Sequence, residues 1–72
     1  MADLELLSVV ALTEDLPGEG LLRGQVGTIV EKLAPNIYEV EFSDDAGETY
    51  AMVPISATLL MRLHHEPKHR AA

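Results

Sequence analysis

Apolar and polar side chains alternate most regularly between residues 37 and 42, which read IYEVEF. Because the side chains of a β-strand point to opposite faces in turn, Tyr38, Val40 and Phe42 share one face. Glu39 and Glu41 share the other face. We therefore predict a half-buried strand whose aromatic and valine side chains lie in the core and whose glutamates face solvent.

Four further segments have the β-branched and apolar content of strands. They are residues 8–13 (SVVALT), 25–33 (QVGTIVEKL), 48–54 (ETYAMVP) and 58–63 (TLLMRL). A Pro-Asn corner and the SDDAG turn flank the central strand, whereas EDLPGEGLLRG has the Pro and Gly content of an irregular loop. Pro54 and the following ISA favour a single helical turn before the last strand. Leucines at positions 4, 6 and 7 favour one short turn before the first strand.

Five short strands in 72 residues cannot form two well-packed separate sheets, and a flat open sheet would leave unpaired edges. We therefore predict an all-β fold, a small, partly open, five-stranded antiparallel barrel over residues 1–63. Val10 and Ile29 join the core residues of the central strand. Gly27 permits the close backbone approach or sharp bend that a small barrel needs. Residues 64–72 (HHEPKHRAA) contain nothing suited to a core, and we predict a disordered tail.

The stretch LRGQVGTIVEKL, with Gly24, Gly27 and the apolar pair Ile29 and Val30, resembles the strand entry of SH3-like barrels. These barrels include the KOW motif and the electron-transport accessory proteins of photosynthesis. A longer part of the chain runs from LLSVVALTEDLPGEGLLRGQVGTIVE through APNIYEVEFSDDAGETYA to the final LL, about residues 6–63. It is similar to an uncharacterised bacterial family known as domain of unknown function 4926 (DUF4926). The resemblance implies an SH3-like barrel, and it carries no activity over to this chain.

Charge and composition narrow the classes of function. The chain has 12 acidic and 5 basic residues, a formal net charge of -7, and no cysteine. Because nucleic-acid binding depends on Lys and Arg that neutralise phosphates, we expect no nucleic-acid partner, and an anionic membrane is disfavoured for the same reason. The uncharged run from Leu6 to Thr13 is far shorter than the roughly 20 apolar residues that cross a bilayer. Together with the lack of cysteine, these features predict a soluble, cytoplasmic protein.

No catalytic arrangement emerges from the sequence, because the acidic residues fall in loops, turns and an outward strand face and every histidine lies in the tail. Asp44 and Asp45 look like paired carboxylates, but adjacent aspartates in a turn more often bond local backbone N–H groups. His65 and His69 have the four-residue spacing of metal ligands on a helix, and Pro67 between them would break that helix. We predict no catalytic residue, no metal site and no cofactor.

The runs SVVALT and TLLMRL are apolar on both faces, whereas a small barrel has a single interior. The excess is absorbed inside the monomer, or the N-terminal leucines cover it, or another chain does. We predict an interaction surface with the candidate residues Glu39, Glu41, Asp44, Asp45, Leu59 and Met61.

The function that we expect is that of a non-enzymatic protein-interaction module, an accessory or neutralising partner of another bacterial protein. It would form a homo-oligomer, through an edge strand or an apolar sheet face, or bind a basic protein partner. One alternative is an antitoxin or immunity protein that covers a basic site. Another is a KOW-like nucleic-acid-binding module, which the acidity disfavours.

Overall fold

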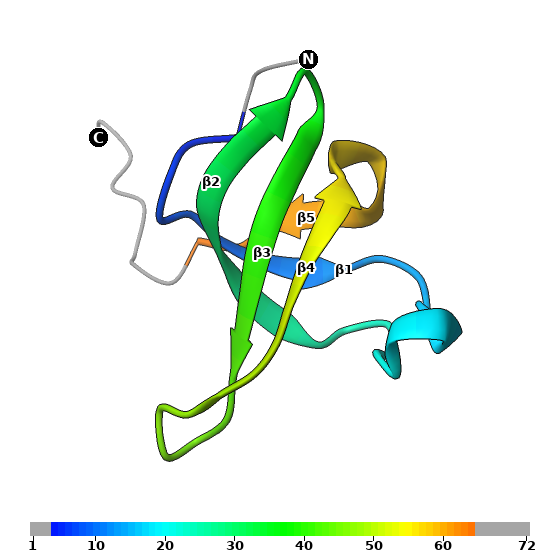
Figure 1. Cartoon of the computed structure of the whole chain (residues 1–72), viewed down its shortest axis with the longest axis vertical. Coiled ribbons are helices and arrows are strands. Elements are labelled where there is room, and N and C mark those ends of the chain that lie inside the picture. The colour runs from blue at the N-terminus through cyan, green and yellow to red at the C-terminus, as the bar shows by residue number, and fades with distance from the viewer. Residues whose placement is uncertain (1–3, 65–72) are drawn as a thin grey trace, which may run out of the picture.

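The computed structural model describes residues 4–64, in which five antiparallel strands form one sheet (Figure 1). The strands are β1 (Val9–Leu12), β2 (Val26–Ala34), β3 (Ile37–Ser43), β4 (Thr49–Ser56) and β5 (Leu60–Arg62). Their order across the sheet is β4-β3-β2-β1-β5. The predicted all-β class and the five antiparallel strands are therefore confirmed.

Strand β2 joins two halves of the sheet. Its residues Val26 to Thr28 pair with β1, and from Thr28 onward β2 pairs with β3. Figure 1 shows β1 and β5 crossing β3 and β4 at a steep angle, so the sheet curls around its inner face. Strands β4 and β5 stand at the two ends of the order and do not pair with each other. The curled sheet is therefore open.

Gly27 lies where β2 passes from pairing with β1 to pairing with β3. A Cβ atom at this position would lie 2.7 Å from Val40 Cγ1 and 2.8 Å from the carbonyl oxygen of Glu41. Any other residue would therefore push β2 away from β3. The close backbone approach predicted at Gly27 is confirmed.

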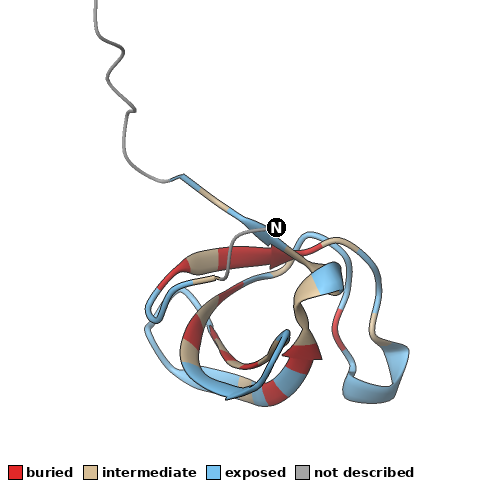
Figure 2. Ribbon diagram, turned by 90° about the horizontal axis from the view of Figure 1, so that it is seen from above, coloured by how far each residue is buried: buried red, intermediate tan, exposed pale blue. Residues whose placement is uncertain are grey.

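The core lies on the inner face of the curled sheet. All five residues predicted to form it are buried and belong to one cluster: Val10, Ile29, Tyr38, Val40 and Phe42. Leu12, Leu21, Val53 and Ile55 complete the cluster. Figure 2 shows the resulting alternation of buried and more exposed residues along the strands.

The loop between β1 and β2 contributes the core residue Leu21, which the strand pattern does not predict. A short 3-10 helix, η1 (Pro17–Glu19), reverses the chain within this loop. Leu16 and Leu21 then form an isolated β-bridge, in which the Leu16 amide donates to the Leu21 carbonyl at 2.8 Å. The loop therefore folds back on itself and turns Leu21 inward.

The last turn and strand begin later than predicted. Strand β4 continues to Ser56, and the helical turn is the 3-10 helix η2 (Ala57–Leu59). The Ser56 hydroxyl accepts a hydrogen bond from the Thr58 amide at 3.3 Å and caps this turn. Leu59 therefore belongs to the turn, and the final strand is limited to Leu60–Arg62.

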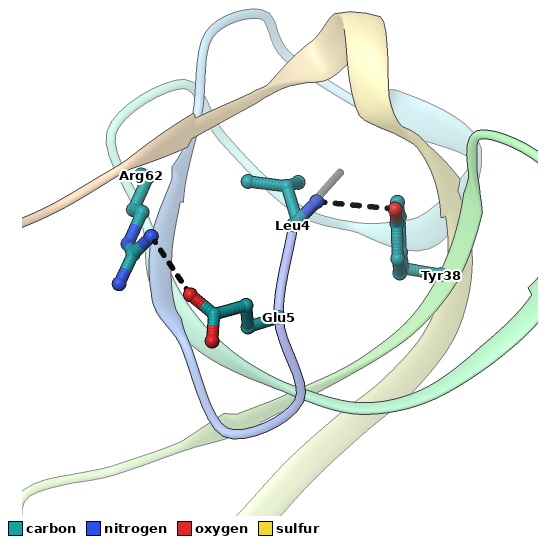
Figure 3. A network of polar contacts seen from close by, with 4 residues as sticks. All are labelled: Leu4, Glu5, Tyr38 and Arg62. Atoms are coloured by element: carbon teal, nitrogen blue, oxygen red, sulfur yellow. Dashed lines mark hydrogen bonds and ion pairs between the residues drawn. The ribbon is translucent and has the colours of Figure 1, made fainter. Parts of the chain in front are cut away.

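The N-terminal segment covers the inner side of the curled sheet near Tyr38 (Figure 3). The Leu4 amide donates to the Tyr38 hydroxyl at 3.2 Å, and the Leu4 side chain packs against the core. Glu5 forms an ion pair with Arg62 of β5 at 3.5 Å. The predicted short turn follows, with the Ser8 amide donating to the Glu5 carbonyl at 3.1 Å. Leu4 and Glu5 thus help to close the inner side of the sheet.

The predicted disordered tail, residues 64–72, lies outside the described residues except for His64, which is exposed. Between residues 4 and 64, no helix has the length and apolar character needed to cross a membrane.

Candidate functional site

Two of the predicted surface residues lie on the outer face of β3. Glu39 and Glu41 flank the fully buried Val40 and are themselves half-buried. Glu41 stands opposite Met52 of β4 and Thr28 of β2, and its carboxylate accepts a hydrogen bond from the Thr49 hydroxyl. The alternation of IYEVEF predicts this orientation correctly.

A third glutamate, Glu31 of β2, stands directly opposite Glu39. The register between β2 and β3 shifts between Ile29 and Glu31, and without that shift Glu31 would share the inner face with Ile29. Two like charges directly opposite each other on a sheet repel. In addition, Oε1 of Glu39 is buried and has no hydrogen-bond partner among the described residues. The outer side of β2 and β3 is therefore strongly acidic, and sequence reasoning missed Glu31 because alternation alone does not reveal a bulge.

Asp44 holds the turn between β3 and β4. Its carboxylate accepts hydrogen bonds from the amides of Ala46 and Glu48, each at 2.9 Å. The Asp44 amide donates to the Glu48 carbonyl at 2.9 Å, which closes the same turn. Asp44 therefore acts as a turn former, as its place in SDDAG predicts, and Asp45 beside it is exposed.

A row of apolar side chains crosses β2, β1 and β5 on the outer face. Val26 stands opposite Ala11, and Ala11 stands opposite Met61. Because Val10 and Leu12 on either side of Ala11 point into the core, this row points outward. The same sheet therefore has an apolar outer region over β1.

Two more residues extend this region. Val9 alternates with the buried Val10, and the Leu63 amide donates to the Val9 carbonyl at 2.8 Å, which places Leu63 beside β1. We refer to Val9, Ala11, Val26, Met61 and Leu63 as the outer apolar face. Val26 is 46% exposed and Met61 is 53% exposed, whereas Ala11 between them is buried, at 5%.

The six predicted surface residues thus fall into separate places. Met61 belongs to the outer apolar face, whereas β2 and β1 separate β5 from the strand that carries Glu39 and Glu41. Asp44 and Asp45 lie in the turn that follows this strand. Leu59 is half-buried and packs against the core from η2. Sequence reasoning did not single out Ala11 and Val26, because alternation within one strand does not show which residues of its neighbours stand opposite.

Both edges of the sheet are poorly suited to pairing with another strand. Strand β4 forms one edge and carries Pro54, whose ring nitrogen has no hydrogen to donate. Strand β5 forms the other edge and is only three residues long. Prolines and short strands are two of the ways in which natural sheets prevent edge-to-edge association.

The described part of the chain, residues 4–64, contains no group of three or more acidic, histidine or cysteine side chains placed to hold a metal ion. His64 is the one histidine in this range, and His65 and His69 lie outside it. The metal-site hypothesis for the tail therefore rests on residues that the structure does not describe.

The chain was compared with protein families, curated proteins and solved structures. No curated protein and no solved structure matches it significantly. The family model described as "Domain of unknown function (DUF4926)" matches residues 6–62, which span all five strands. This match covers most of the 72 residues, and the chain therefore belongs to the DUF4926 family.

Proposed function

We propose that this protein is a non-enzymatic protein-interaction module that binds another protein through its outer apolar face. The observation that carries the proposal is that Val26 and Met61, on the two strands that flank the buried Ala11, are apolar and about half exposed on the outer face. Contiguous exposed apolar surface with a polar border is typical of interaction sites. Burial of such surface stabilises by roughly 25 cal/mol per Å², a gain that matters in a domain with a small core.

The edges of the sheet support contact through a face. An added strand needs a row of free N–H and C=O groups, and Pro54 interrupts that row on β4. Strand β5 offers only the backbone of Leu60–Arg62. A partner that packs side chains onto the outer apolar face requires neither edge.

Nucleic acid is a weaker candidate for the partner. The described residues include three basic side chains, and these do not form one patch. Arg23 lies in the loop before β2, Lys32 lies on β2, and Arg62 is paired with Glu5. Phosphate binding requires several clustered cations, so the KOW-like alternative has little electrostatic support. An accessory, antitoxin or immunity protein needs no such cluster.

A matched pair of methionine substitutions tests the proposal. Met61 on β5 and Met52 on β4 have nearly equal exposed fractions, 53% and 51%, and lie on opposite edge strands of the sheet. Each is replaced by Gln, and the immobilised wild type and variants are incubated with extract of the native host. Bound proteins are then quantified by mass spectrometry.

We expect the Met52→Gln variant to retain the same bound protein as the wild type and Met61→Gln to lose most of it. The reason is that Met61 contributes apolar contact to the outer apolar face and Met52 does not. Circular dichroism of both variants checks that they fold. Equal recovery by the two folded variants would show that the outer apolar face is not the binding surface.

A further inference from the structure

The outer apolar face has acidic neighbours on the side of β3. Thr28 of β2 stands opposite Val9 on one side and Glu41 on the other. Neighbouring strands lie about 4.8 Å apart, so Glu41 is about two strand spacings from Val9 and about one from the strand that carries Val26. The hydrogen bond from the Thr49 hydroxyl restricts the Glu41 carboxylate, so this side chain loses less conformational entropy when a partner binds.

Further acids lie at the end of β1. The chain leaves this strand through Glu14 and Asp15, both exposed. Asp15 accepts a hydrogen bond from the Arg23 amide at 2.8 Å, which connects this segment to the loop before β2. Arg23 brings one basic side chain to the same end. The border is therefore acidic on balance, in keeping with ten acidic and three basic residues between positions 4 and 64.

A second copy of this chain is a poor occupant of the outer apolar face. A two-fold symmetric contact places the same patch of both subunits together, so its bordering acids would meet. Each chain carries a net charge of -7, and like-charge contacts across an interface are unfavourable. Continuous pairing of two sheets is hindered by Pro54 at one edge and by the short β5 at the other.

We propose that the occupant is a basic amphipathic segment of a different protein, with apolar side chains on the exposed Val26 and Met61 and with Lys or Arg side chains at the acidic border. This inference rests on the proposed function and adds the chemistry of the partner. Val26 and Met61 provide the contact area, and Glu41 selects for positive charge. Complementary charge speeds encounter and rejects acidic competitors.

Synthetic peptides and NMR spectroscopy test the proposal. Isotope-labelled full-length protein is titrated with a short peptide of alternating Leu and Lys. Two further peptides serve as comparisons: one alternates Leu and Glu, and the other alternates Ser and Lys. We expect the Leu–Lys peptide to shift the methyl signals of Val9, Ala11, Val26 and Met61 in a saturable way. We expect much smaller shifts from the other two peptides.

Two variants test whether peptide binding depends on a charge at the acidic border or on the net charge of the whole chain. Glu41→Gln removes a charge beside the outer apolar face, and Glu48→Gln removes one from the turn between β3 and β4. We expect Glu41→Gln to weaken binding of the Leu–Lys peptide by roughly two- to five-fold at low salt. Glu48→Gln should change it by less than about two-fold. Binding should also weaken as salt lowers the Debye length from about 30 Å at 0.01 M to about 8 Å at 0.15 M.

Each other outcome contradicts the proposal in a distinct way. Equal binding of the Leu–Lys and Leu–Glu peptides would retain the outer apolar face as a binding surface and reject its selection for basic partners. Equal binding of the Leu–Lys and Ser–Lys peptides, or no saturable shift on the outer apolar face, would reject both the inference and that surface. Methyl shifts that depend on protein concentration alone, and grow with salt, would identify a second copy as the occupant.

Discussion

At the scale of single residues, Gly27 determines how closely β2 and β3 can approach. Its missing side chain leaves room for Val40 and Phe42, both fully buried. Gly18 in η1 provides a contrast, because a Cβ atom there would meet nothing within 4 Å. Substitutions at the two positions therefore distinguish the need for space at Gly27 from the general effect of glycine on backbone flexibility.

We expect Gly27→Ala to lower the free energy of unfolding by about 1–3 kcal/mol, because the added methyl group overlaps backbone as well as side-chain atoms. Gly18→Ala should change it by less than about 1 kcal/mol, and the change can be stabilising because alanine restricts the unfolded chain. Urea denaturation of the two variants measures both values. Similar losses for the two would mean that β2 and β3 are not in close contact at Gly27.

Leu7 has an unusual backbone conformation for a large side chain. Its φ angle is 67°, and 74% of the residue is exposed. This left-handed conformation costs an L-residue about 1–2 kcal/mol. The hydrogen bond from the Leu7 amide to the Ile29 carbonyl, at 2.7 Å, helps to hold it. At Leu7, attachment of the N-terminal segment to β2 therefore overrides the preference of a large side chain for a negative φ angle.

At the scale of elements, the turn between β3 and β4 is stabilised by one aspartate of an adjacent pair. Asp44 accepts two backbone hydrogen bonds and Asp45 is exposed. Because of this asymmetry, measurements of stability can distinguish a turn-forming Asp44 from a catalytic pair of carboxylates. A catalytic pair would require both side chains, whereas a turn former requires only Asp44.

We expect Asp44→Ala to lower the free energy of unfolding by about 1–2 kcal/mol, because two amides lose their acceptor. Asp45→Ala should change it by less than about 0.5 kcal/mol, as is usual for an exposed position. Thermal or urea denaturation of the two variants provides the comparison. Equal destabilisation would show that the turn depends on both carboxylates.

The elements also show how far alternation predicts structure. It located β3 and its core residues Tyr38, Val40 and Phe42 correctly, because each strand face meets a single environment. It placed the last strand too early, because Ser56 caps a 3-10 turn that holds Leu59 against the core. Local capping chemistry, which an apolar run does not show, set that boundary.

At the scale of the whole molecule, the family match ends at residue 62, the last residue of β5. Strand β5 pairs with β1 through Leu60, Met61 and Arg62, and Leu60 packs against the core. The predicted tail begins two residues later, at His64. Removal of the tail and removal of β5 should therefore have very different effects.

We expect a chain that ends at His64 to keep the urea midpoint of the full protein, since HEPKHRAA offers no side chain suited to a core. A chain that ends at Leu59 should be largely unfolded, because a domain this small depends on every core contact. Circular dichroism and urea denaturation of both truncations test this. A clear fall in the midpoint on loss of residues 65–72 would show that they contribute to stability, and would renew interest in the histidines of the tail.

The sequence alone determined the all-β class, the approximate positions of the strands and the inner face, because period-two alternation reflects which side of a strand meets water. It also determined the acidic character that makes a basic partner the better candidate. Only the tertiary structure decided which residues stand opposite one another. Ala11 meets Val26 and Met61 because β1 lies between β2 and β5, and Glu31 meets Glu39 because a bulge shifts the register. Such pairings depend on strand order and register, and these arise from packing of distant segments that no local pattern encodes.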